Sequence, residues 1–286
     1  MTNGHATPTM TRRRIGALLR RYRIGAEMAS KDAARAAGLD PTRIGRIEQG
    51  RYRITPEQIT ALMSAYGVDD EGAREELCRA AQEPPNAGWW TPYRTHLTTA
   101  YADFIALESD ATSLRVQHPV VIPGLLQCPS YARAMLESSI HPPTRERADT
   151  LFAVRMGRQQ IINRPGTPVR LHAVVPEAAF RARFETPTVI REQARHLLTL
   201  SEQENVTIQV LLLESPPNFG MYQAGTLLEF RHPWPAALSF DNWRGGSITE
   251  DADEVAAMET HFDQLSKIAL SAEDSAEFLE NQLQKG

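Results

Sequence analysis

The sequence has little cysteine and lacks long apolar runs. Its two cysteines, Cys78 and Cys128, lie 50 residues apart and form no metal-binding or redox spacing, so we interpret them as small apolar residues in a reducing compartment. No run approaches the roughly 20 apolar residues that span a bilayer. The arginine-containing N-terminus has no apolar signal-peptide segment. The sequence therefore predicts a cytoplasmic protein that does not enter a membrane.

Motifs of common catalytic sites are also missing. The eight histidines are scattered, without the H-x-H or H-E-x-x-H spacing that binds zinc. Neither a G-x-S-x-G nucleophile elbow nor a G-x-x-x-x-G-K-[ST] phosphate loop occurs. We therefore expect no metal, no cofactor and no enzymatic activity. Two carboxylates far apart in the chain would leave no such motif, so that alternative stays open.

Charge is distributed unevenly along the 286 residues, a length that favours two domains. The net charge is −4, but residues 11–53 hold twelve Lys and Arg against four Asp and Glu, a local charge of +8. The rest of the chain consequently carries −12. We expect only the basic segment to approach a polyanion, while the acidic remainder faces away from it.

Apolar spacing and helix-start signals predict five helices between residues 11 and 82. The first has apolar residues at i, i+3, i+4 and i+7, opposite an arginine-rich face. Gly38 suits the left-handed position after the second helix, and Asp40 with Pro41 starts the third. The predicted helices are 11–23, 30–37, 41–49, 56–66 and one after Asp69 that ends near residue 81.

The second and third of these helices predict a helix-turn-helix. Ile44 and Ile47 lie three residues apart and point inward with Leu39. Three polar side chains are left outside near the start of the third helix, Thr42, Arg43 and Arg46. A helical bundle with a solvated basic face is the alternative. The cap, the glycine turn and the core spacing together favour DNA binding.

The stretch AARAAGLDPTRIGRIEQG at 33–50 resembles the phage-repressor-like (XRE-type) helix-turn-helix. The resemblance implies that Thr42, Arg43 and Arg46 read base edges, and that Glu48 is structural. The family's usual glutamine at the start of the second helix is missing, and we expect Ser30 to replace it or to serve as the cap. We interpret Gly45 as a position that permits close approach to the bases. The expected phosphate contacts are Arg20, Arg21, Arg51, Tyr52 and Arg53.

The segment QEPPNAGWW reads as a domain boundary, which divides the chain into domains at 11–82 and 88–286. The second domain alternates predicted strands and helices and is expected to be α+β, with helices on a mostly antiparallel sheet. The predicted extended segments are 113–121, 169–175, 206–213, 225–231 and 236–240. The predicted helices are 91–107, one following Pro123–Gly124, one from Thr144, 186–203, 253–270 and 272–283.

The second domain resembles the region that follows the helix-turn-helix in WhiJ-like, or Scr-type antitoxin-like, actinobacterial regulators. The resemblance rests on VIPGLLQCPSYARAML, the R-x-x-R-Q element at 155–159, ENVTIQVLLL, GTLLEF and GGSITEDADEV. Cys128 and the SITED segment depart from the family pattern. The resemblance implies a cytoplasmic transcriptional regulator that acts with a small partner protein.

Two groups of side chains in the predicted second domain are candidates for binding a ligand or partner. Arg155 and Arg158 are either salt-bridged supports of the core or an anion-binding pair. Aromatic residues near loops either cover the core edges or line a pocket. These aromatic candidates are Trp89, Trp90, Trp234 and Trp243.

Together these patterns predict a homodimeric repressor-like transcription factor that binds double-stranded DNA at a pseudo-palindromic operator. A small molecule or a small partner protein would control it through residues 88–286. The alternative is a protein-interaction antitoxin whose main role is to neutralise a small partner protein.

Overall fold

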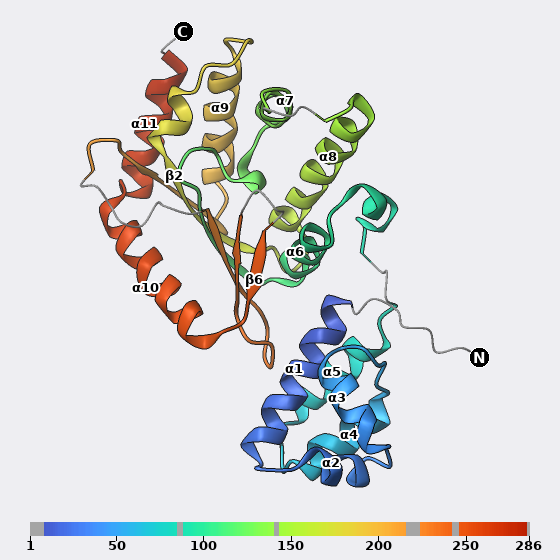
Figure 1. Cartoon of the computed structure of the whole chain (residues 1–286). Helices are drawn as coiled ribbons and strands as arrows, with labels where there is room; N and C mark the ends of the chain where they lie inside the picture. The colour runs from blue at the N-terminus through green and yellow to red at the C-terminus, as the bar shows by residue number, and fades with distance from the viewer. Residues whose placement is uncertain (1–8, 85–87, 140–142, 216–223, 242–245, 285–286) are drawn as a thin grey trace. The chain divides into compact units, whose positions relative to one another are not determined.

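A computed structural model describes residues 9–84, 88–139, 143–215, 224–241 and 246–284 (Figure 1). The chain divides into two compact units. The first comprises Met1–Thr91 together with Arg231–Pro235, and the second comprises Pro92–Phe230 and Ala236–Gly286.

Five helices form the first unit, as the sequence predicts. Side chains cap four of them, because Thr9, Asp40, Thr55 and Asp70 each accept a hydrogen bond from a backbone N–H in the first turn. The fifth cap is therefore Asp70 and not Asp69. The helices are α1 (Met10–Gly25), α2 (Ser30–Ala36), α3 (Pro41–Glu48), α4 (Pro56–Ala65) and α5 (Glu71–Gln82).

The helices of the first unit share one apolar core, and α1 crosses α3 closely at Gly16. A Cβ placed on Gly16 would lie 2.2 Å from the carbonyl oxygen of Ile47. Only a glycine permits this approach of the two helices. The most buried core side chains, at most 2 % exposed, are Ile15, Leu18, Leu19, Ile44, Ile47, Ile59, Leu62, Met63 and Leu77.

The second unit contains a six-stranded mixed sheet in the order β3-β2-β1-β4-β5-β6. The pairs β1–β2 and β2–β3 are parallel, whereas β1–β4, β4–β5 and β5–β6 are antiparallel. The predicted α+β class with a mostly antiparallel sheet is confirmed. The strands are β1 (Ser113–Gln117), β2 (Arg170–Pro176), β3 (Val206–Leu211), β4 (Gly225–Glu229), β5 (Ala237–Phe240) and β6 (Ser247–Thr249).

Helices lie on both faces of this sheet, with α10 on one side and α6 and α8 on the other (Figure 1). Phe262 and Leu265 of α10 pack on Val174 of β2, and Met258 packs on Leu227 of β4. The helices are α6 (Thr99–Asp110), α7 (Pro129–Glu137), α8 (Arg145–Arg158), α9 (Val189–Ser201), α10 (Ala252–Ile268) and α11 (Ala272–Gln284). The 3-10 helices are η1 (Thr91–His96), η2 (Gly124–Leu126), η3 (Gln159–Asn163) and η4 (Glu177–Arg181).

The structure departs from the sequence prediction at two elements. The prediction of one helix over 91–107 is wrong, because two separate elements occupy this segment. η1 ends at His96, and the side chain of Thr98 then caps the start of α6. The three-residue strand β6 pairs with β5 and was not predicted, since a segment of three residues carries no periodicity.

The close crossing at Gly16 predicts opposite effects for two glycine-to-alanine substitutions. Gly16→Ala should destabilise the first unit by about 1–3 kcal/mol, because the new methyl group meets backbone atoms that cannot rotate away. Gly45→Ala should stabilise α3 by about 1 kcal/mol, because nothing lies within 4 Å of its Cβ position. Urea unfolding followed by circular dichroism measures both, and equal effects of the two substitutions would contradict the close crossing.

Candidate nucleic-acid interface

The helices α2 and α3 form the predicted helix-turn-helix. Gly38 connects them with a φ of +63°, the left-handed conformation that its position after α2 requires. Ile44 and Ile47 point into the core and are 1 % and 2 % exposed. The opposite side of α3 is consequently free to contact a partner. The side chains exposed there belong to the N-terminal half and the middle of the helix.

Thr42 stands at the start of α3 with its hydroxyl orientation fixed. Its Oγ1 donates to Asp40 Oδ1 at 2.5 Å, and its backbone N–H donates to the same oxygen at 2.8 Å. The side-chain bond and then the backbone bond lower the pKa of Asp40, which stays ionised at neutral pH. Because the Thr42 proton is engaged, the hydroxyl presents lone pairs, which suit an amino group of adenine or cytosine.

Two arginines share the exposed side of α3 with Thr42, and the structure gives them different surroundings. The Arg43 guanidinium lies over the Tyr52 ring, 5.2 Å from its centroid, so a cation–π contact orients it. Arg46 is exposed and forms no ion pair in the described part of the chain. Nothing lies within 4 Å of a Cβ built on Gly45. The gap between the two arginines therefore lets the backbone of α3 approach a base edge.

A buried ion pair between Arg23 and Glu48 fixes the C-terminal end of α3. Arg23 Nε donates to Glu48 Oε1 at 2.6 Å and its Nη2 donates to Oε2 at 3.0 Å, with side chains 14 % and 9 % exposed. The hydrogen bond to Glu48 raises the pKa of Arg23. Glu48 is thus structural, as expected. Arg23 was missed as its partner, because the pairing spans 25 residues and leaves no local pattern.

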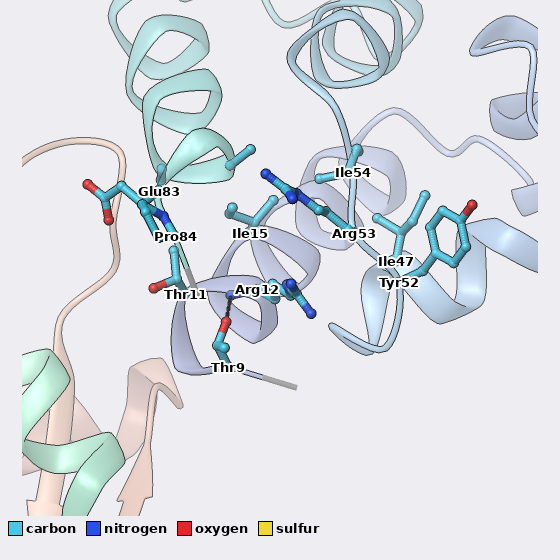
Figure 2. A pocket seen from close by; sticks show the side chains of 12 residues that line it. Thr9, Thr11, Arg12, Ile15, Ile47, Tyr52, Arg53, Ile54, Glu83 and Pro84 are labelled. Atoms are coloured by element: carbon cyan, nitrogen blue, oxygen red, sulfur yellow. Dashed lines mark hydrogen bonds between the residues drawn. The ribbon is translucent and has the colours of Figure 1, made fainter. Parts of the chain in front are cut away.

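A small hollow of about 40 Å³ brings Arg12 of α1 together with Arg53, which follows α3 (Figure 2). Neither guanidinium forms an ion pair with a described carboxylate. Burial lowers the pKa of Arg12, and the nearby charge of Arg53 lowers it further. A phosphate between these like charges would relieve their repulsion. Arg12 was missed in the sequence because it is one of three consecutive arginines that local spacing does not distinguish.

The other predicted phosphate contacts are more dispersed. Arg51 is exposed beside Tyr52, whereas Arg20 and Arg21 are exposed in the C-terminal half of α1. At 3.6 residues per turn, Arg21 lies half a turn around α1 from Arg12, so these two do not serve one phosphate. Ser30 is the first residue of α2 and does not cap it. Ala29 occupies the cap position, without a side-chain hydrogen bond.

The tryptophan candidates do not gather into one site. Trp89 and Trp90 belong to the first unit and contact each other edge to face, with ring centroids 5.9 Å apart. Trp234 also belongs to the first unit, where it packs on the helical core and its Nε1 donates to Glu76 Oε1 at 2.8 Å. Trp243 lies outside the described residues.

The two arginines of the R-x-x-R-Q element lie in the second unit and have different partners. Arg158 donates through Nε and Nη2 to the two carboxylate oxygens of Glu108, both at 2.7 Å. Arg155 instead donates to Gln127 Oε1 at 2.8 Å and forms no ion pair within the described part of the chain. The element therefore supplies one salt-bridged support and one guanidinium without a counter-charge.

Comparison with protein families agrees with this geometry. Residues 14–77 match a helix-turn-helix domain, which defines the first unit as that of a DNA-binding regulator. Residues 101–281 match a domain of unknown function, DUF5753, and because this match covers more than half of the sequence, the chain belongs to the DUF5753 family. No curated protein and no solved structure matches the chain.

No helix in the described part of the chain is long and apolar enough to cross a membrane. No group of three or more His, Cys, Asp or Glu side chains there has a metal-binding arrangement.

The hollow between Arg12 and Arg53 predicts a phosphate contact that is independent of DNA sequence. Arg12→Gln and Arg53→Gln should each weaken binding to random-sequence duplexes and reduce the slope of log K against log salt concentration by about 1. Fluorescence anisotropy at several salt concentrations measures the slope. Arg147→Gln on α8, which removes the same charge at an exposed position that does not line the hollow, serves as the control. Unchanged slopes in both variants would exclude the contact.

Proposed function

We propose that this protein is a sequence-specific, XRE-type transcriptional regulator that lays α3 in the major groove of duplex DNA. The observation that carries the proposal is the outward row of Thr42, Arg43 and Arg46 on a helix whose other side is fully buried. Arginine bonds guanine O6 and N7 in the major groove, and this contact specifies sequence. The local charge of +8 over residues 11–53 supports the same orientation through attraction to phosphates.

The proposal includes dimerisation on DNA. One helix-turn-helix contacts only a few base pairs, and two related by a twofold axis read half-sites about 34 Å apart. We therefore expect a homodimer on a pseudo-palindromic operator. A regulator of this kind acts where DNA is accessible, so we place it in the cytoplasm.

The second unit is proposed to control this binding. Its resemblance to WhiJ-like regulators supports control by a small molecule or by a small partner protein, as in antitoxin-like pairs. Such a ligand changes DNA affinity only through a difference in its own affinity for two states of the regulator. Because Arg155 of this unit forms no ion pair in the described part of the chain, we propose that the unit acts by binding an anion and not by catalysis.

Arg46 provides the sharpest test of sequence reading. Selection from a random duplex library by the wild-type chain gives a preferred site, and binding is then measured on single-base variants of that site. Arg46→Ala should lose about 1–3 kcal/mol on the preferred site and relax the preference at one base pair, because one bidentate contact is removed.

Arg79→Ala controls for the lost charge, because it removes one arginine from α5 and should leave the base preference unchanged. A uniform loss of affinity across all site variants would make Arg46 a phosphate contact. If the wild-type chain selected no preferred sequence, the proposal of sequence-specific regulation would be wrong.

A further inference from the structure

The second unit contains a cavity of about 250 Å³ that the proposed DNA contact does not use. It lies against β1, β2 and β4, and helices α6 and α8 with the 3-10 helix η2 supply its other walls. This volume is just below the roughly 300–1,000 Å³ of pockets that hold drug-sized ligands. Its walls are mixed, with a polar side that holds Arg155 and His118 and an apolar side that includes Phe104, Val116, Ile122, Leu125, Leu151 and Leu171.

One of the two arginines at this cavity is already neutralised. Arg158 and Glu108 have side chains only 10 % and 2 % exposed, and their ion pair is bidentate. Arg158 Nη1 also donates to the Tyr101 hydroxyl at 3.0 Å. Charge and hydrogen-bonding capacity are therefore matched within the pair, so Arg158 supports the wall and is not expected to bind a further anion.

Arg155 is not neutralised. Its one hydrogen bond goes to the neutral amide of Gln127, and its Nε is buried without a hydrogen-bond partner among the described residues. Burial lowers the pKa of Arg155, while the negative charge of Asp241 opposes this shift. Asp241 also lines the cavity but is exposed and forms no ion pair with Arg155. Buried charges in proteins are normally paired, so this position is suited to an anion from outside.

His118 provides a second donor on the cavity wall. Its Nδ1 accepts hydrogen bonds from the backbone N–H groups of Val120 at 3.2 Å and Val121 at 3.1 Å. The proton of the neutral ring is therefore on Nε2. Burial lowers the pKa of His118, while the charge of Asp241 opposes this shift, so the imidazole is neutral at pH 7. The side chain can donate a hydrogen bond without adding charge.

Three glutamine side chains form hydrogen bonds with the loop that carries Gln127, the hydrogen-bond partner of Arg155. Gln127 Nε2 donates to the Ile122 carbonyl at 2.7 Å, and Gln159 Nε2 donates to the Gln127 carbonyl at 2.7 Å. Gln193 bonds the same loop from α9, with its Nε2 donating to the Leu126 carbonyl at 2.7 Å and its Oε1 accepting from Cys128 N at 2.8 Å. The PGLLQ and R-x-x-R-Q segments thus form one rigid network, and its preorganisation lowers the entropic cost of binding.

We propose that this cavity binds a small carboxylate with a compact apolar body, whose carboxylate group pairs with Arg155. The single uncompensated guanidinium matches one negative charge, whereas a phosphate monoester carries a charge of about −1.5 to −2 at neutral pH. The apolar walls match a hydrocarbon or aromatic body. This inference deepens the proposed control through the second unit and rests on that function only for its effect on DNA.

Direct binding to the full chain tests the inference without DNA. The probes are benzoate and hexanoate, each compared with its uncharged amide, in a buffer free of other carboxylates and of phosphate. Isothermal calorimetry should detect both carboxylates at millimolar concentrations and neither amide. Arg155→Met should weaken carboxylate binding by about tenfold or more, because a charge-assisted hydrogen bond is lost.

Two further variants make the test specific. Arg147→Met removes the same charge from an exposed position on α8 and should leave affinity unchanged. Arg155→Lys keeps the charge but loses the planar fork, so it should weaken binding severalfold even if Arg155→Met does not fold. Equal affinity for acid and amide, equal affinity of the wild type and both Arg155 variants, tighter binding of phenyl phosphate than of benzoate, or no carboxylate binding by the folded wild type would each overturn the inference.

The two proposals fail separately. A chain that binds its selected DNA site but no carboxylate refutes the cavity inference alone. A chain that binds benzoate through Arg155 but has no preferred DNA sequence refutes the proposed function alone.

Discussion

The cost of removing a guanidinium from water constrains both units of this protein. An arginine that enters the interior needs a carboxylate or an equivalent set of acceptors, or its charge destabilises the fold. Arg23 meets this requirement with Glu48 at the end of α3, and Arg158 meets it with Glu108 at the wall of the second-unit cavity. In each case a bidentate pair holds an element at a candidate site, and the pair of Arg158 and Glu108 forms part of the cavity wall.

Arginines without a carboxylate partner in the described part of the chain indicate where an anion from outside could bind. Arg12 and Arg53 line the same hollow, and Arg155 hydrogen-bonds only a neutral amide among the described residues. An arrangement that is unfavourable in the isolated chain becomes favourable when an anion arrives, because the anion supplies the missing charge. The same physical argument therefore supports both the proposed phosphate contact in the first unit and the proposed carboxylate site in the second.

Local patterns in the sequence predicted much of the fold and the outline of the DNA interface. Gly38 predicted the end of α2, Asp40 with Pro41 predicted the start of α3, and periodicity separated the buried isoleucines of α3 from its exposed arginines. Long-range pairing was not predictable. Arg155 and Arg158 belong to one short element, and their different roles depend on Glu108 and Gln127, which lie far away in the chain and leave no spacing signal.

The two candidate sites differ in solvent exposure, and therefore in how strongly salt screens their charges. The arginines around α3 are mostly exposed, so salt screens their attraction to DNA over a Debye length of about 8 Å at physiological ionic strength. The Arg155 guanidinium lines a cavity and is partly buried, so salt screens its charge less. Any control of DNA affinity by the cavity requires a ligand that binds two states of the regulator with different affinities.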